Sequence, residues 1–321
     1  MKNRVACLTM IVAVIVAMIV AVSAHGATGS EKLIVVVPQA QITISDSPGS
    51  SQLKVHFNES EMVLVKRDGN YELRLRAPQN KDSLLAATAG LRVIEIVGPS
   101  LPVEIHLMEG QVALNQWKKE ALIHIQRGKV IAKEGRAPLA IQVHKGEIMV
   151  SDHLGKLRID SYSSNVQIKN LIGDLELDNF SGESVLEKAK GRMELRQTNG
   201  AAKVIQGSGN LQFELGRAIL NSTNFAGRVE GQSQEGPVNI NMALESEINV
   251  KTQTGRVTIH GVAGSSLNVH TQEGEIIGPS YLQIQKEGAS KTLRGRLQGQ
   301  SPGASNGIIY VRTQEGPIVL K

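Results

Sequence analysis

A glycine returns every eighteen residues through the middle of this chain, and this spacing constrains the fold more than any other feature. The series comprises Gly110, Gly128, Gly146, Gly182, Gly200 and Gly236, and small residues fill its two gaps, Ser164 and Ala218. A second series runs nine residues out of phase and comprises Gly155, Gly173, Gly191, Gly209 and Gly227. Self-similarity at a fixed period of this length predicts a solenoid with one coil per repeat.

Apolar residues occupy fixed places around each glycine. Isoleucine lies five residues before it at 105, 123, 141 and 159, and a branched residue lies two after it at 112, 130, 148 and 166. The residues between them are mostly polar, and this alternation is typical of strands with one buried face. The sequence therefore predicts an all-β fold, a single-stranded parallel β-solenoid (β-helix) with coils of about 18 residues, over 99–321. An ordinary β-sandwich is the alternative, but nothing in that fold requires a constant spacing of eighteen residues.

The phase shifts toward the C-terminus, where Gly255 and Gly274 come at steps of nineteen. A local motif persists in Ser233-Gln-Glu-Gly, Thr252-Gln-Thr-Gly, Thr271-Gln-Glu-Gly and Thr313-Gln-Glu-Gly. Stacked Thr and Gln at one corner are expected to form ladders of hydrogen-bonded side chains between coils. Residues 279–306 carry Gly, Pro and Ser and are expected to form an irregular, enlarged layer.

The first residues resemble a targeting segment. Lys2 and Arg4 precede an almost unbroken apolar run, Val5 to Val22, and Val22-Ser23-Ala24 supplies a small-residue cleavage site. We expect 1–24 to be a signal peptide, with an uncleaved membrane anchor as the alternative because the run is long. The chain would then be exported to the periplasm or the cell surface. Cys7, the single cysteine, lies inside this segment, so the mature chain would form no disulfide.

Between the leader and the repeats, residues 31–98 contain short strand-like runs such as 33–37 and 41–44, separated by turn residues. A solenoid needs a cover over its first coil, so we expect an N-terminal β cap here, or degenerate coils. The first coils carry apolar residues at outward positions, namely Leu122, Ala140, Ile131 and Met149, with Trp117 nearby. We expect the cap to cover them, and a partner surface is the alternative.

The C-terminus, Gly316-Pro-Ile-Val-Leu-Lys321, ends inside a coil strand with no helix after it. The last coil would be exposed unless 279–306 folds over it or another molecule stacks there. End-to-end self-association through this C-terminal layer is therefore a hypothesis.

Composition excludes several function classes. The 35 basic residues are scattered among 30 acidic ones, and this mixture is unlike the basic stripe that nucleic acid requires. Aromatic residues make up 3%, which suits a thin aliphatic core. No Ser–His–Asp signature, phosphate-binding loop or dinucleotide fingerprint occurs, so no catalytic or cofactor-binding residue is assigned and no cofactor is expected.

Two clusters could carry chemistry. His106 and His124 share an outward column and are a conceivable two-ligand cation site, although metal sites generally need three or four ligands. Asp160 and Asp178, with Glu176 and Glu194 in the column two residues earlier, form an acidic patch flanked by Arg158 and Arg196. Paired carboxylates can cleave glycans or bind calcium. We expect the two histidines to be solvated. We expect the charged residues of the acidic patch to form a ladder across adjacent strands, in which the charges of Asp178 and Arg196 offset each other.

The tandem units Ile248-Asn-Val-Lys-Thr-Gln-Thr-Gly-Arg-Val-Thr-Ile259 and Leu267-Asn-Val-His-Thr-Gln-Glu-Gly-Glu-Ile-Ile277 resemble those of the bacterial putative-adhesin family. The resemblance covers roughly 100–320 and implies an exported β-solenoid domain. It carries no catalytic residues over to this chain.

Three functions follow as hypotheses. The first is an exported, non-enzymatic solenoid that presents a surface for adhesion or scaffolding to an envelope protein or a glycan, with a membrane tether if the leader is retained. The second is a self-assembling polymer like the bactofilins. The third is a glycan-active β-helix enzyme, which would need an aromatic-lined groove with exposed carboxylates.

Overall fold

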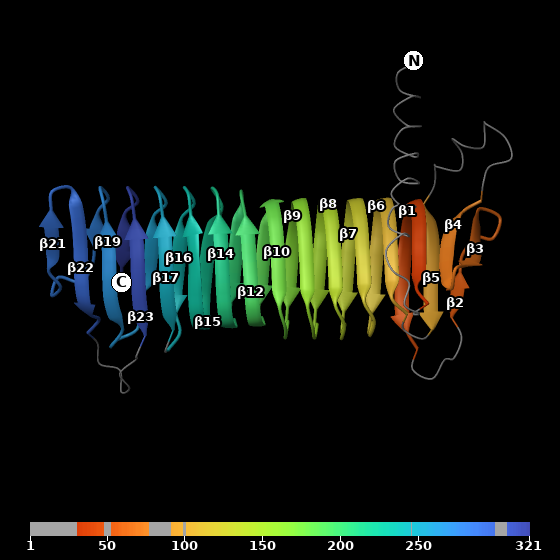
Figure 1. Cartoon of the computed structure of the whole chain (residues 1–321), viewed down its shortest axis with the longest axis horizontal. Helices are drawn as coiled ribbons and strands as arrows, with labels where there is room; N and C mark the ends of the chain where they lie inside the picture. Colours follow the sequence, from red (N-terminus) through yellow and green to blue (C-terminus); the bar gives the residue numbers. More distant parts are fainter. Residues whose placement is uncertain (1–30, 48–52, 77–90, 99–100, 245, 299–306) are drawn as a thin grey trace, which may run out of the picture.

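The computed structural model describes residues 31–47, 53–76, 91–98, 101–244, 246–298 and 307–321, and it is all-β in these ranges. The strands lie side by side along the long axis of the molecule (Figure 1). No helix within these ranges is long and apolar enough to cross a membrane. The expectation of an all-β fold is confirmed, and the leader 1–24 lies outside the described residues.

The regular part begins with five long strands that pair in parallel and in register. They are β1 (Leu33–Asp46), β6 (Val103–Asn115), β7 (Ala121–Lys133), β8 (Leu139–Ser151) and β9 (Leu157–Lys169). From β6 to β9 each residue pairs with the one eighteen positions later, so that Ile105 pairs with Ile123. The runs expected on either side of Pro38 form one strand, β1, which pairs with β6 along its length.

After β9 each eighteen-residue period contributes two shorter strands, which continue two rows of parallel pairings. The first row contains β10 (Leu175–Ser181), β12 (Lys190–Gln197) and β14 (Ser208–Leu215). The second row contains β11 (Glu183–Glu187) and β13 (Ala201–Ile205). β15 (Ile219–Ser233) belongs to both rows, and β17 (Glu247–Thr252) continues the first while β16 (Val238–Met242) and β18 (Val257–His260) continue the second. Alternate side chains of both rows are buried, and they form the aliphatic core.

The glycine series marks places where neighbouring backbones approach closely. Gly182 has a φ of +122°, and a Cβ there would lie 2.2 Å from the carbonyl oxygen of Ser164. Gly110 has a φ of +150°, and its Cβ would lie 1.9 Å from the carbonyl oxygen of Ala40. Glycine alone avoids both the contact and the backbone strain.

A second turn column is left-handed yet contains few glycines. Its residues have φ angles of 53–55° and recur every eighteen positions: Gln116, Glu134, Asp152, Asn170, Lys188, Gln206 and Asn224. Side chains in neighbouring turns join this column, because the amide nitrogen of Asn170 donates to Asp152 at 2.7 Å and that of Gln116 donates to Glu134 at 2.9 Å. Left-handed φ is unfavourable for non-glycine residues, so these turns are imposed by the surrounding strands.

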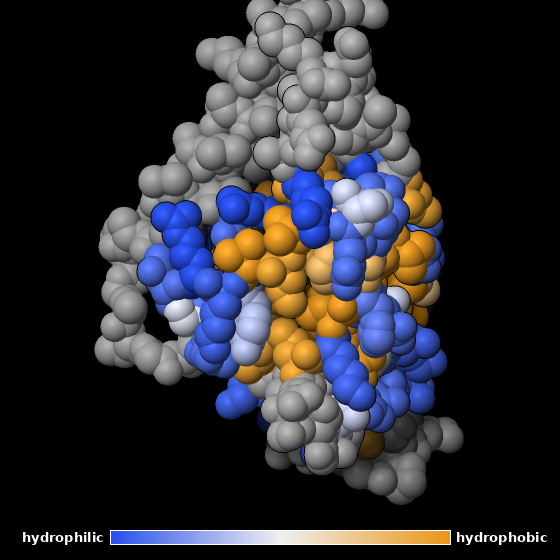
Figure 2. Space-filling view, turned by 90° about the vertical axis from the view of Figure 1, so that its right-hand side faces the viewer, coloured by the Kyte–Doolittle hydropathy of each residue, from blue (hydrophilic) through white to orange (hydrophobic). Residues whose placement is uncertain are grey.

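Four strands, β2 (Lys54–His56), β3 (Met62–Arg67), β4 (Asn70–Leu75) and β5 (Arg92–Gly98), form the N-terminal end. β4 and β5 pair in parallel with β1, while β2 and β3 pair antiparallel with β5 and β4. Figure 2 shows an apolar area with a hydrophilic rim on this end of the molecule. Leu91 and Val93, 59% and 66% exposed, are apolar residues of this end.

The expectation that this cap covers the outward residues of the first coils is wrong. Leu122, Ile131 and Ala140 stay partly exposed, and Met149 is 37% exposed, because β2–β5 lie at the end of the row rather than over its face. Trp117 is 4% exposed and packs into the core.

The C-terminal strands do not form the last layer, which corrects the expectation for Gly316–Lys321. β23 (Ile308–Thr313) lies between β17 and β19 (Ser266–Thr271), parallel to both, and β24 (Ile318–Leu320) lies between β18 and β20 (Ile276–Ile277). The hairpin of β21 (Ile284–Glu287) and β22 (Ser290–Arg296) pairs antiparallel with β19 and closes this end. The hairpin belongs to the 279–306 segment, of which residues 299–306 lie outside the described residues.

The Ser/Thr-Gln-x-Gly motif recurs at one corner, with its hydroxyl side chain buried and its glutamine exposed. Ser233, Thr252 and Thr313 each donate from the hydroxyl to the carbonyl of the glycine three residues later, at 2.7–2.9 Å. The motif therefore stabilises its own turn. Contact between side chains of neighbouring strands occurs at Thr313 and Thr271, whose hydroxyl oxygens lie 2.8 Å apart.

Candidate binding face

The outward side of the first row, from β6 to β14, carries both clusters singled out in the sequence, and we call it the binding face. Residues at every second position of these strands point outward, in register with the same positions of the next strand. The face thus contains columns of side chains at the spacing of parallel strands, about 4.8 Å.

An aromatic stack runs across the middle of this face. The ring centroids of His144 and Tyr162 lie 4.9 Å apart at an interplanar angle of 8°, and those of Tyr162 and Phe180 lie 4.9 Å apart at 3°. Tyr162 is 53% exposed and Phe180 is 41% exposed. His144 belongs to this stack because its position is equivalent to that of Tyr162 one period later.

The stack exposes ring edges rather than ring faces. Since each ring lies over the next at the strand spacing, both faces of Tyr162 are covered by its neighbours. A sugar ring that stacks on an aromatic face would therefore find room only at the two ends of the stack. The exposed edges are suited to a flat partner surface, where aromatic side chains contribute most of the binding energy.

The four acidic residues of the expected patch lie on the same face as the stack, and three of them have a cationic partner. Arg158 Nε lies 3.0 Å from Asp160 Oδ2, Lys156 Nζ lies 2.6 Å from Glu176 Oε1, and Arg192 Nη2 lies 2.5 Å from Glu194 Oε1. Asp178 pairs in register with Arg196 on the neighbouring strand. Arg196 forms its ion pair with Glu214 instead, at 3.4 Å, so the expected offset between Asp178 and Arg196 is not the ion pair that forms.

The environment of Glu176 favours its ionised form. The Lys156 ammonium, through its hydrogen bond, lowers the pKa of Glu176, whereas a glycosidic general acid needs a raised one. The Asp160 carboxylate accepts a hydrogen bond from Arg158 Nε at 3.0 Å. The patch is thus an arrangement of paired, half-exposed charges, typical of a solvated face or of the rim of a protein interface.

The histidine pair lies on the same face, closer to the N-terminal end. The rings of His106 and His124 stack with centroids 4.8 Å apart. His106 Nε2 contacts Glu104 Oε1 at 2.8 Å, and Lys32 Nζ contacts Glu104 Oε2 at 2.7 Å. The hydrogen bond with His106 is the largest influence that lowers the pKa of Glu104, to about 2, while burial lowers that of His124.

This cluster forms a chain of hydrogen bonds. The carboxylate of Glu104 is engaged on one oxygen by an ammonium and on the other by an imidazole. Within the described part of the chain, no group of three or more His, Cys, Asp or Glu side chains gathers in a geometry that could hold a metal ion. The stacked rings and their acidic neighbour therefore stabilise the face locally.

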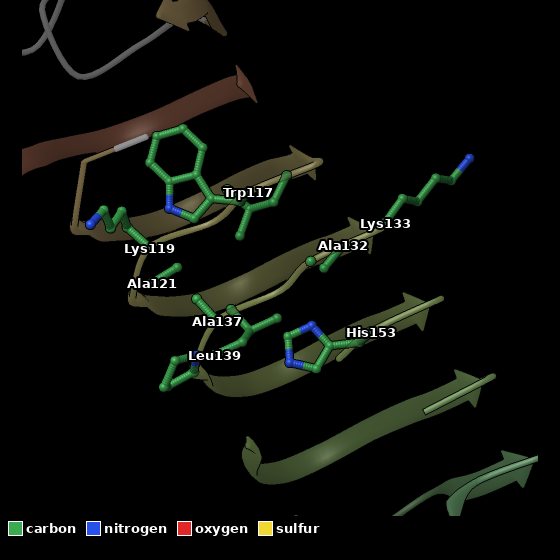
Figure 3. A pocket seen from close by; sticks show the side chains of 11 residues that line it. Trp117, Lys119, Ala121, Ala132, Lys133, Ala137, Leu139 and His153 are labelled. Carbon is green, nitrogen blue, oxygen red and sulfur yellow. The ribbon is translucent and has the colours of Figure 1, made fainter. Parts of the chain in front are cut away.

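A small cavity lies inside the opposite turn, between Trp117 and His153 (Figure 3). Gly135 leaves room for the ring of His153, because a Cβ at position 135 would lie 2.6 Å from His153 Nδ1. Burial lowers the pKa of His153, so that its ring is neutral near pH 7. The cavity volume of about 10 Å³ holds at most one water molecule and no larger ligand.

A wider, open depression lies over the glycine turns near the N-terminal end. Its volume is about 360 Å³, and its lining includes Gln39, Gln41, Leu91, Gln111, Arg127 and Lys129. Both cations are paired, Arg127 with Glu109 at 3.3 Å and Lys129 with Glu147 at 2.9 Å. The depression thus has amide groups but little uncompensated charge to orient a ligand.

The sequence contains a signal for the aromatic stack in the spacing of its three residues. His144, Tyr162 and Phe180 are eighteen residues apart, so their spacing alone places them on one line. Spacing at the repeat period, applied to every residue type, would have predicted the stack.

Comparison with known proteins yields structural neighbours only. No protein-family model matches the chain, and no curated protein matches it. One solved structure, of a putative adhesin from Bacteroides fragilis, matches with 11% identity over 92% of this chain and 94% of its own, at a TM-score of 0.23. Another, of a putative cell adhesion protein from Clostridium sporogenes, matches with 12% identity over 91% and 92%, at a TM-score of 0.17. Both names agree with the resemblance seen in the tandem units, and at such scores the likeness itself carries no argument about function.

Proposed function

We propose that this chain is an exported, non-enzymatic, single-stranded β-solenoid whose binding face makes adhesin-like or scaffolding contacts in the cell envelope. The single observation that carries the proposal is the exposed stack of His144, Tyr162 and Phe180. A solvated face has no need of two large aromatic side chains that are 53% and 41% exposed. Aromatic residues surrounded by charged pairs are typical of the centre and rim of a protein interface.

The partner that suits this face best is a protein rather than a glycan. The ring edges, not the ring faces, are open to solvent, and the flanking charges of both signs can match a mixed surface. An envelope protein is therefore the first candidate, and an envelope glycan is the second. A retained leader would tether the chain to the membrane from the N-terminal end.

The experiment compares two matched double variants of the full chain. Tyr162→Ser with Phe180→Ser removes the stack, and Leu154→Ser with Ile172→Ser removes two exposed apolar side chains that pair on a different edge of the molecule. Saturable binding of each labelled protein to envelope fractions of the producing cell is measured, before and after protease or glycosidase treatment of those fractions.

We expect the aromatic variant to lose at least about tenfold in affinity and the control variant to keep the affinity of the native chain. Loss after protease treatment, but not after glycosidase treatment, would identify a protein partner. The proposal fails if the native chain does not bind saturably or if both double variants bind like it. Release of products from envelope polysaccharide, abolished by Asp160→Asn, would instead support the glycan-active alternative.

A further inference from the structure

The place of β23 and β24 carries an inference that is independent of the binding face. We propose that the slot between β17–β18 and β19–β20 accepts the C-terminal strands of a second copy of this chain as well as its own, so that the protein forms strand-exchanged oligomers.

The slot is a two-sided site for an extended segment. β23 pairs with β17 from Glu247↔Ile308 to Thr252↔Thr313, and its other edge pairs with β19 from Ser266↔Ile308 to Thr271↔Thr313. The pairing extends into the turns, where the backbone N–H of Glu315 donates to Gln253 at 2.9 Å and that of Glu273 donates to Gln314 at 2.8 Å. A strand that fills this slot satisfies both edges at once.

The slot also recognises side chains, by burying every second one. Ile309, Val311, Thr313, Ile318 and Leu320 are at most 5% exposed. The inserted sequence Ile309-Tyr-Val-Arg-Thr-Gln-Glu-Gly has the same pattern as its two neighbours, Ile248-Asn-Val-Lys-Thr-Gln-Thr-Gly and Leu267-Asn-Val-His-Thr-Gln-Glu-Gly. The specificity of the slot is therefore for this unit, wherever the unit comes from.

The order of the strands separates the inserted unit from the rest of the fold. β17 and β19 are connected along the chain through β18 and residues 261–265, and β18 pairs with β16 on its other edge, so both walls of the slot precede the inserted strands in the sequence. The segment that fills it, β23 and β24, follows the hairpin of β21 and β22 along the chain. Exchange thus requires the segment after the hairpin to leave, while the strands from β1 to β22 keep their places.

End-to-end stacking is the less favourable route to assembly. The outermost strand at the C-terminal end is β21, four residues long, with Gln285, Lys286 and Glu287 exposed. A short, charged edge discourages pairing with another molecule. Self-association through the C-terminal segment is therefore expected to occur inside the slot. It should rise with protein concentration, because at low concentration the strand of the same chain, held nearby by its covalent connection, fills the slot in preference to the strand of another molecule.

The test uses disulfide trapping in the full chain carrying Cys7→Ser, which contains no other cysteine. Lys251 and Arg312 are exposed and directly paired on β17 and β23, so Lys251→Cys and Arg312→Cys can form a disulfide across the slot. The control pair is Arg196→Cys and Glu214→Cys, exposed and directly paired on the internal strands β12 and β14. Each single-cysteine variant is mixed with its mate, unfolded, refolded at low and at high protein concentration, and oxidised.

We expect the Lys251→Cys and Arg312→Cys mixture to give a covalent dimer on non-reducing gels, rising with concentration and exceeding the control mixture by at least about tenfold. The double variant in one chain should form its disulfide within the monomer at low concentration. Two results would overturn the proposal. One is a heterodimer yield equal to that of the control at every concentration, and the other is no disulfide within the double variant, which would show that the strand does not occupy the slot.

Discussion

The side-chain oxygens of Thr313 and Thr271 lie 2.8 Å apart in the buried corner of neighbouring strands, although 42 residues separate them in the chain. Both belong to the same four-residue motif. The order of the motif in space is Ser233, Thr252, Thr313 and Thr271, so the last copy in sequence takes the third place. The two threonines are in contact because the C-terminal strand β23 lies between two earlier strands, β17 and β19.

Thr313→Val should destabilise the C-terminal end. The valine is nearly isosteric, but it leaves the carbonyl of Gly316 and the hydroxyl of Thr271 without the buried hydroxyl that both contact. We expect a loss of about 1–3 kcal/mol in the free energy of unfolding, measured by urea denaturation. Thr258→Val, on a partly exposed position of β18, is the control and should change it by less than about 0.5 kcal/mol. Equal effects of the two substitutions would contradict the role of the hydroxyl.

Gly182→Ala should be among the most damaging single-methyl changes. The new Cβ would lie 2.2 Å from the carbonyl oxygen of Ser164, at a φ of +122°. Two neighbouring strands would have to separate, and we expect a loss of at least about 3 kcal/mol, seen as a fall in the urea midpoint. Gly69→Ala has a φ of +80° with no atom within 4 Å and should cost about 1 kcal/mol. A similar midpoint for both variants would show that close approach does not explain the glycine period.

Lys188→Asn should stabilise the protein. Lys188 is exposed and has a left-handed φ of 55°, which asparagine adopts more readily than lysine. We expect a gain of about 0.5–1 kcal/mol in thermal or urea unfolding. The matched control is Lys190→Asn, two residues later in β12, where asparagine has no such advantage and β propensity falls. Stabilisation by the control, or none by Lys188→Asn, would contradict the argument.

Acid should weaken the fold through Glu104. Its folded pKa of about 2 lies below the usual 4.5, chiefly because it contacts His106, so the ionised form is favoured in the folded state. The stabilisation is fully present above pH 4.5 and is lost as the pH falls toward 2, with an upper value of about 3 kcal/mol.

Glu104→Gln should therefore reduce the loss of unfolding free energy between pH 5 and pH 2.5, measured by urea denaturation at each pH. Glu109→Gln is the control, because Glu109 is 52% exposed and pairs with Arg127 on the surface. The native chain and the control should lose stability in parallel. An unchanged pH dependence in Glu104→Gln would refute the assignment.

The sequence by itself determined the repeat. Eighteen-residue spacing of glycine and isoleucine sets which residues pair, because one strand can lie on the next in register only if its side-chain pattern matches. Ile105 with Ile123 and Gly110 with Gly128 follow directly from counting. The acidic patch and the stacked histidines were predictable for the same reason, since equal positions in successive periods become neighbours.

Only the tertiary structure decided where the periodicity ends and what closes it. β23 fits between β17 and β19 because the three units share one pattern, so local sequence does not distinguish the last place from an inner one. Whether Arg196 pairs with Asp178 or with Glu214 depends on side-chain reach between strands that offer both carboxylates. Likewise, Trp117 is buried and lines a small cavity together with Gly135 and His153 of neighbouring turns, a relationship that alternation along one strand does not specify.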